Sequence, residues 1–277
     1  MKRFPRFLLL ALLFIPFLTL QAQTGENEIP ASNKSLLRAA LKGWNLRLGA
    51  GFSIGGTSPL PLPAEIRHID SYQPTLCIML TGMAQKKITK RWGIMTGLRF
   101  EEKGMKTDAR VKNYHMEARE DDGSDIIGAF TGHVKTKVSN KYLTFPLLAT
   151  YTISPKWQVQ AGPYFSYLIS GEFSGEAYGN PVFDETTGEE TGRDSYIRDQ
   201  DPTGNKTEVS HATYEFSDKL RRFNWGLQVG GEFKAFRHLA VSLDLTWAFN
   251  GIFPSDFTSV TFDLYPIYGT LGFHYLF

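Results

Sequence analysis

Residues 223–250 have the sequence FNWGLQVGGEFKAFRHLAVSLDLTWAFN, in which two stretches of alternating apolar and polar residues flank a short connection at 236–238. In the first stretch, one face of an extended chain carries only apolar residues, which are Phe223, Trp225, Leu227, Val229 and Phe233. The opposite face carries glycine, Asn, Gln and charged residues. Because the side chains of a β-strand alternate between its two faces, this pattern predicts two antiparallel strands, each with one apolar face.

The same period of two recurs along most of the chain. It predicts eight strands, at residues 44–54, 75–81, 92–101, 142–153, 157–170, 223–234, 239–250 and 265–277. A strand that crosses a membrane needs about 9–11 residues, whereas a strand of an ordinary soluble sheet has about 5–6. Most of the predicted strands therefore have the length of membrane-crossing strands.

The connections between the predicted strands alternate in length. Those at 86–91, 154–156 and 236–238 are short, and those at 55–73, 103–138, 171–221 and 251–264 are long. Short turns at one end and long loops at the other are typical of outer-membrane barrels. Tryptophans near the strand ends fit two interfacial girdles, made by Trp44, Trp92, Trp157, Trp225 and Trp247. We therefore predict that residues 43–277 form a single eight-stranded antiparallel transmembrane (outer-membrane) β-barrel, with short periplasmic turns and long extracellular loops.

A soluble barrel is the alternative fold. A secreted calycin-like barrel turns its apolar face inward around a ligand and its polar face toward water. Its polar face would carry mostly Lys, Glu and Asp, but here that face is rich in glycine. The apolar face also carries aromatic residues at its ends. Both features favour the membrane barrel.

The N-terminus has the layout of a cleaved signal peptide. Lys2, Arg3 and Arg6 precede the apolar run 7–20, and Ala22 offers a small residue at the cleavage site. We expect residues 1–22 to be removed and residues 23–42 to form a periplasmic lead-in. The mature chain would then have 27 basic and 28 acidic residues, a net charge of −1 instead of +2. This balance gives no support to a nucleic-acid partner.

The polar face of the predicted barrel carries charged residues that would face its interior. These are Arg47, Arg99, Glu101, Lys103, Glu232, Lys234, Asp244 and His274. Side chains fill the interior of an eight-stranded barrel, and buried charges must pair there. We expect a polar network that plugs the barrel; a path for protons or ions is the alternative.

The sequence nominates no catalytic residue, no cofactor and no metal site. Its six histidines lack metal-ligand spacing, its serines lie in no GxSxG turn, and Cys77 is the single cysteine. Acidic stretches at 121–125 and 199–204 weakly resemble calcium loops. In the second, the twelfth position is Ser210 instead of Glu. Solvated surface loops are the simpler interpretation.

Several motifs resemble the PorT-like outer-membrane β-barrel family of Bacteroidota. The stretches KYLTFPLL at 141–148 and QAGPYFSYL at 160–168 are similar to its paired strands, and FNWGL at 223–227 and LDLTW at 243–247 to two others. The end of the chain resembles the signal read by the outer-membrane barrel assembly machinery, with Phe273, Tyr275 and Phe277 as its aromatic positions. The resemblance implies a barrel in the bacterial outer membrane and suggests an association with protein secretion.

These observations predict a non-enzymatic barrel in contact with outer-membrane lipid, with a structural, binding or accessory role. We expect a protein partner to contact the loops 103–138 and 171–221. Their aromatic residues could act as anchors: Tyr114, Phe130, Tyr178, Phe183, Tyr196, Tyr214 and Phe216. The alternatives are a narrow channel or transporter for small solutes, with extra strands at 105–135 and 207–220, and an enzyme whose site lies on the loops. These two stretches could instead extend strands beyond the membrane.

Overall fold

The computed structural model describes residues 43–120, 123, 125–184, 186–199, 206–257, 259–260 and 262–277. The chain divides into Met1–Gly43 and Trp44–Phe277, and every described strand lies in the second unit. The expected signal peptide at 1–22 and lead-in at 23–42 fall outside the described residues. Among the residues described, there is no helix with the length and hydropathy to cross a membrane.

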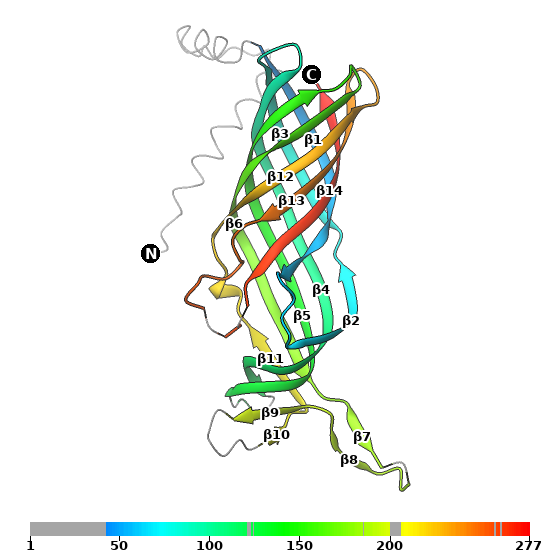
Figure 1. Cartoon of the computed structure of the whole chain (residues 1–277), viewed down its shortest axis with the longest axis vertical. Helices are drawn as coiled ribbons and strands as arrows, with labels where there is room; N and C mark the ends of the chain where they lie inside the picture. Colours follow the sequence, from blue (N-terminus) through cyan, green and yellow to red (C-terminus); the bar gives the residue numbers. More distant parts are fainter. Residues whose placement is uncertain are drawn as a thin grey trace, which may run out of the picture. The chain divides into compact units, whose positions relative to one another are not determined.

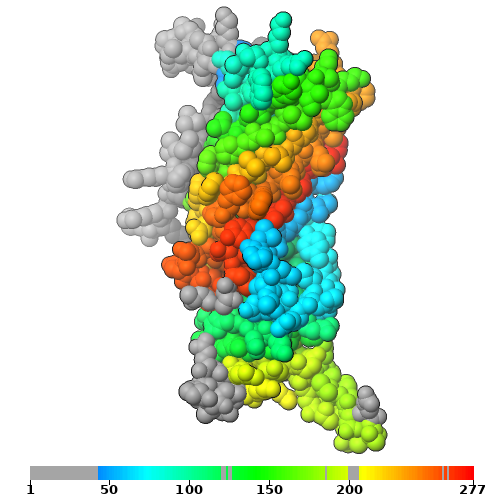
Figure 2. All heavy atoms as spheres, viewed as in Figure 1, coloured from blue at the N-terminus to red at the C-terminus, as the bar shows by residue number. Residues whose placement is uncertain are grey.

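Eight long strands pair in a cycle, which we call the ring. In pairing order they are β1 (Trp44–Pro59), β3 (Cys77–Lys87), β4 (Trp92–Glu120), β5 (Asp125–Thr152), β6 (Trp157–Tyr178), β12 (Phe223–Lys234), β13 (Leu239–Ala248) and β14 (Leu264–Leu276). All neighbours are antiparallel, and β14 pairs with β1, so the order returns to its start (Figure 1). Figure 2 shows this junction, where the red residues of β14 lie beside the blue residues of β1.

The expectation of eight strands in all is wrong, because the described residues form fourteen. The additional strands come from the connections that the sequence marked as long loops: β2 (Ile66–Pro74), β7 (Pro181–Phe183), β8 (Glu190–Arg193), β9 (Tyr196–Asp199), β10 (Lys206–Glu208) and β11 (His211–Glu215). A short 3₁₀ helix, Ser217–Lys219, follows β11. β2, β9, β10 and β11 join the sheet of the ring, whereas β7 and β8 pair with each other.

Three ring strands continue far beyond their predicted ends. The expected loop 103–138 is largely the paired continuation of β4 and β5, and β6 runs to Tyr178. Figure 1 shows these strands reaching past the others. We call this part the extension: residues 104–120 of β4, 125–140 of β5 and 171–178 of β6, together with β2, β9, β10 and β11.

The polarity of the two faces reverses along β5. In the ring portion, Phe145 and Leu147 are about half exposed on the outer face, while Thr144 is buried inside. In the extension, Lys135 and Lys137 are exposed and Val138 is buried. An exposed apolar wall this extensive is typical of a surface that water does not contact. The outer face of the ring and that of the extension therefore suit different surroundings.

The extension has a hydrophobic core of its own. Phe173 packs edge-on against Phe253, with ring centroids 4.9 Å apart, and Phe253 stacks on Phe257 at 4.4 Å. The connection between β13 and β14 thus folds into this core, and the Arg221 guanidinium holds it by donating to the carbonyl oxygens of Gly251 and Phe253. The cluster also includes Tyr142 and Leu168 of the ring strands, so the core begins where the polar ring interior ends.

Candidate functional site

One ion pair of the ring interior joins two strands that do not pair with each other. Arg47 of β1 places Nη1 2.5 Å from Oε2 of Glu232 on β12. Its Nη2 donates to the side-chain oxygen of Gln85. The Gln85 amide in turn donates to Thr150 Oγ1 at 3.1 Å and to Gln158 Oε1 at 2.8 Å. This network crosses the interior near the short-turn end of the ring.

A second network surrounds the buried carboxylate of Glu101. Lys103 Nζ lies 3.2 Å from Oε1 and Arg99 Nη1 lies 3.8 Å from Oε2. Thr144 donates its hydroxyl to Oε1 at 2.7 Å. The Lys103 ammonium also faces three tyrosine rings, with centroid distances of 5.0 Å to Tyr164 and 5.7 Å to both Tyr142 and Tyr268. Aromatic faces attract a cation, so Lys103 is held by both charge and ring contacts.

A third network is centred on Asp244. Its Oδ1 accepts from Gln160 Nε2 at 2.5 Å and from Gln228 Nε2 at 3.0 Å. Its Oδ2 accepts from Ser242 at 3.0 Å, and the Ser242 hydroxyl lies 2.9 Å from His274 Nε2. A side chain at Gly230 would collide with the Asp244 carboxylate. Glycine on the inner face therefore leaves space for a larger polar neighbour.

The predicted interior residues are thus buried together, with one exception. Lys234 is exposed at the end of β12, so its assignment to the interior network is wrong. Alternation places it on the same face as Glu232, but its side chain lies beyond the rim and reaches water. Of the other predicted residues, those that form interior ion pairs or charged hydrogen bonds are Arg47, Arg99, Glu101, Lys103, Glu232 and Asp244. They comprise three cations and three carboxylates, so their formal charges cancel.

The predicted girdle and assembly-signal residues lie on the outer face. Trp92, Trp157, Trp225 and Trp247 are between 44% and 54% exposed, and Trp44 is less so. Trp157 packs against Phe233 with centroids 4.9 Å apart. The side chains of the assembly-signal positions are all exposed as well: Phe273, Tyr275 and Phe277.

The extension carries a groove of about 940 Å³ between β2, β4, β5, β6 and β11. β4 contributes to the groove twice, because its end bends across to pair Arg119 with Thr213 of β11. The bend falls where the β4–β5 register shifts, with Asn113 at φ 54° and Gly132 at φ 155°. A side chain at Gly132 would collide with Phe130 and Ser195.

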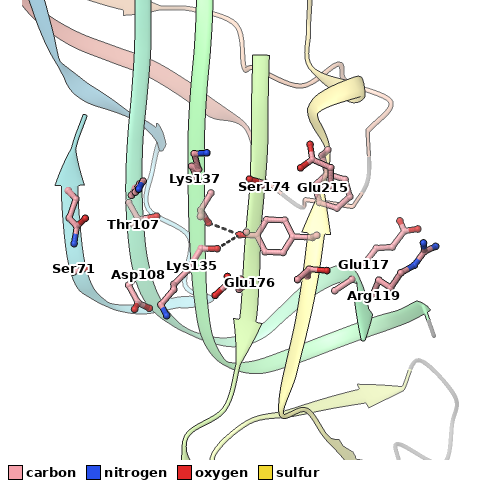
Figure 3. A pocket seen from close by; sticks show the side chains of 18 residues that line it. Ser71, Thr107, Asp108, Glu117, Arg119, Lys135, Lys137, Ser174, Glu176 and Glu215 are labelled. Atoms are coloured by element: carbon pink, nitrogen blue, oxygen red, sulfur yellow. Dashed lines mark hydrogen bonds between the residues drawn. The ribbon is translucent and has the colours of Figure 1, made fainter. Parts of the chain in front are cut away.

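Both signs of charge line this groove. Figure 3 shows Lys135, Lys137 and Glu176 on neighbouring strands, with Glu117 and Arg119 on the returning end of β4. Lys106, Asp108 and Glu215 complete the charged lining, which thus has four basic and four acidic side chains. Such a surface complements a partner that carries both charges, since like charges placed opposite each other are unfavourable.

Tyr214 lies between the groove and the hydrophobic core of the extension. Its hydroxyl is 2.7 Å from Thr136 Oγ1 and donates to the carbonyl of Lys135 at 2.8 Å, as the dashed lines in Figure 3 mark. Burial raises the pKa of Tyr214 above its usual range. Tyr214 and Phe130 are core residues, so the expectation that they anchor a partner is wrong. Phe183 is exposed, and its role as an anchor stays a prediction.

Sequence reasoning missed the groove because its main prediction treated 103–138 as a loop and kept strands at 105–135 as an alternative. The sequence does carry a signal there, because polar and apolar residues still alternate but on exchanged faces. The lysines at 135, 137 and 141 take the outer positions, and Val134 and Val138 take the inner ones. The two acidic stretches that resemble calcium loops, 121–125 and 199–204, fall mainly outside the described residues.

The comparison with family models agrees with this architecture. A family model described as outer membrane protein beta-barrel domain matches residues 21–254. It identifies the barrel domain without distinguishing the PorT-like subgroup. No curated protein sequence matches the chain.

Similar solved structures include Ail, the attachment invasion locus protein of Yersinia pestis, solved with the heparin analogue sucrose octasulfate. It has 8% identity and a TM-score of 0.35, with 84% of this chain and 99% of Ail covered. Neisserial surface protein A has 10% identity and a TM-score of 0.28, with 85% and 98% covered. OprG from Pseudomonas aeruginosa has 12% identity and a TM-score of 0.27, with 85% and 97% covered. Because these TM-scores are low, the assignment to a family rests on the family model alone, which covers most of the sequence. The chain belongs to the outer membrane protein beta-barrel domain family.

Proposed function

We propose that the eight-strand ring crosses the outer membrane, with its short turns in the periplasm and the extension outside the cell. The observation that supports the membrane boundary is the change of polarity on the outer face of β5 between Lys141 and Leu143, and the orientation follows from the short turns at one end of the ring. The stretch 143–153 is 11 residues long and its outward-facing residues are apolar, which matches the span of a tilted membrane strand. In this proposal residues 1–22 are removed as a signal peptide, and the assembly machinery reads the C-terminal aromatic positions.

We further propose a non-enzymatic binding or accessory role, with the extension as the contact surface. The three interior networks occupy the ring with two sets of paired charges and one hydrogen-bonded carboxylate, which opposes an open channel. The groove offers four basic and four acidic side chains at one place. This supports a protein partner with mixed charge, and an association with protein secretion would agree with the PorT-like resemblance.

Site-specific crosslinking in intact cells tests this role. A photo-crosslinking residue in place of Lys135 or Glu176, which line the groove, should capture a discrete protein partner. The matched control replaces Leu243, which is 66% exposed on the outer face of the ring and faces lipid in this proposal. Capture at the control position alone, or at neither groove position, would contradict the proposed contact surface.

The membrane placement needs a separate measurement. The folded barrel should be found in the outer-membrane fraction and should migrate faster in gels before heating than after it. Reconstituted protein should show no discrete conductance in planar bilayers. A soluble periplasmic protein without a heat-dependent shift would contradict the membrane barrel, whereas regular conductance steps would favour the channel.

A further inference from the structure

We propose that Asp70, Asp108 and His133 form a binding site for a divalent transition-metal ion on the extension. The three residues come from three strands, β2, β4 and β5, and one potential ligand atom from each lies within 4.8 Å of the other two. Two ligands of one ion at about 2.0–2.2 Å from it lie roughly 3–4 Å apart, so small side-chain rotations bring these atoms to bonding distance.

Strand pairing brings the three side chains together. Asp108 pairs with Lys135, two residues from His133, so Asp108 and His133 are diagonal neighbours on one face of the sheet. Asp70 lies in the register shift between Ile69 and Ser71, where β2 pairs with β4. A bulge of this kind redirects a side chain, and here it brings Asp70 Oδ2 to 3.4 Å from His133 Nδ1.

One carboxylate oxygen of each proposed aspartate ligand accepts a hydrogen bond from a neighbouring side chain, which leaves the other oxygen for the ion. Arg110 donates to Asp70 Oδ1 at 3.1 Å, and Tyr178 donates its hydroxyl to Asp108 Oδ2 at 2.8 Å. The remaining oxygen of Asp108, Oδ1, is buried without a hydrogen-bond partner.

His133 has the same arrangement. Its Nε2 lies 3.1 Å from Asn180 Nδ2 and 3.4 Å from Asp194 Oδ2, and Asn180 also holds that carboxylate with two hydrogen bonds. When Nε2–H is directed to Asp194, the lone pair of Nδ1 faces Asp70. Metal-binding histidines commonly have their second nitrogen oriented by a carboxylate in this way. The Tyr178 ring stacks on the imidazole, with centroids 5.2 Å apart, and restricts its rotation.

The ligand set indicates the class of metal. One imidazole nitrogen and two carboxylate oxygens suit Zn²⁺ or a similar first-row divalent ion, whereas calcium and magnesium sites use oxygen ligands. Asp70, Asp108 and Asp194 outnumber the bordering cations Arg110 and Lys135, so the surroundings favour a cation; the His68 imidazole also lies 3.8 Å from Asp70 Oδ1. A bound ion would tie β2 to β4 and β5 and thereby stabilise the extension.

Zinc titration of the purified, tag-free full-length chain in detergent tests the site. We expect His133→Gln and Asp108→Asn to lose one equivalent of Zn²⁺, or to bind it roughly tenfold or more weakly than the parent chain. The matched control is His238→Gln, because His238 is exposed at the short-turn end of the ring. Zinc should raise the thermal midpoint of the parent and of the control, but not that of the two site variants.

A variant that does not show the heat-dependent gel shift is replaced by Asp70→Asn, whose side chain is partly exposed. The proposal is overturned if the parent chain binds no zinc saturably, or if the site variants and the control bind equal amounts.

Discussion

Arg47 of β1 and Glu232 of β12 form an ion pair of 2.5 Å across the interior of the ring, although they are 185 positions apart and their strands do not pair. Both side chains are more than 90% buried. Each charge therefore stabilises the other, because burial removes both from water and only their mutual attraction offsets the lost hydration energy.

Removing one member of this pair should be costly. We expect Glu232→Ala to lower the free energy of unfolding by about 3–5 kcal/mol. Urea unfolding of the reconstituted protein, followed by tryptophan fluorescence, would measure the loss. The double variant Arg47→Met with Glu232→Met should regain most of the stability, and an additive effect of the two substitutions would contradict the coupling.

The ion pair between Lys137 and Glu172 should contribute far less. Its N–O distance is 2.6 Å, but both side chains are nearly half exposed on the extension. We expect Glu172→Gln to change stability by less than about 1 kcal/mol.

The pH dependence of this pair has a definite sign. The hydrogen bond from Lys137 lowers the pKa of Glu172. The contribution of this ion pair to folding stability is therefore complete above the ordinary pKa of a glutamate carboxyl group. It is lost as the pH falls through the lowered pKa that Glu172 has in the folded protein. Unfolding curves of the parent and of Glu172→Gln should accordingly converge at acidic pH, and a difference that grows on acidification would contradict this.

Charged substitutions distinguish a lipid-facing wall from a water-facing one. Leu243 is 66% exposed near the middle of β13, and Ile127 is 52% exposed in the extension. We expect Leu243→Arg to destabilise the protein in bilayers by about 2–4 kcal/mol, because a cation at the bilayer midplane is unfavourable. Ile127→Arg is the matched control and should have little effect in the same unfolding measurement. Equal effects would argue against a membrane around the ring.

The core of the extension should unfold separately from the ring when weakened. Phe173 is 3% exposed and packs on Phe253, so Phe173→Ala should cost about 3–5 kcal/mol within this core. Limited proteolysis should then cleave the extension faster, while the heat-dependent gel shift of the ring persists. Phe183→Ala removes an exposed ring and should leave the proteolysis rate unchanged. Loss of the gel shift in Phe173→Ala would indicate one cooperative unit instead.

Local sequence was sufficient for the ring because period-two alternation identifies the face of each residue. The apolar positions 145 and 147 are outward and Thr144 is inward, as the pattern predicts. The same rule was insufficient at strand ends. Lys234 continues the inward face of β12 in sequence, yet it is exposed because the ring ends there.

The sequence left strands that extend beyond the membrane as an alternative only, because the apolar residues change from the outer to the inner face at Lys141. Residues 134–141 still alternate, but their lysines are outside and their valines inside, as in a protein surrounded by water. A shift in the β5–β6 register falls between Lys141 and Tyr142, at the same level. Alternation over these residues is compatible with a strand, but it does not show whether lipid or water surrounds that strand.

The sequence by itself determined the ring strands, their apolar outer face and the charged residues available to the interior, because these follow from alternation between adjacent positions. Only the tertiary structure decided which charges meet. Arg47 finds Glu232 across the ring, and Asp70, Asp108 and His133 converge from three strands. Such contacts depend on strand order, register and bulges, which are set by pairing between segments far apart in the chain and leave no local spacing to recognise.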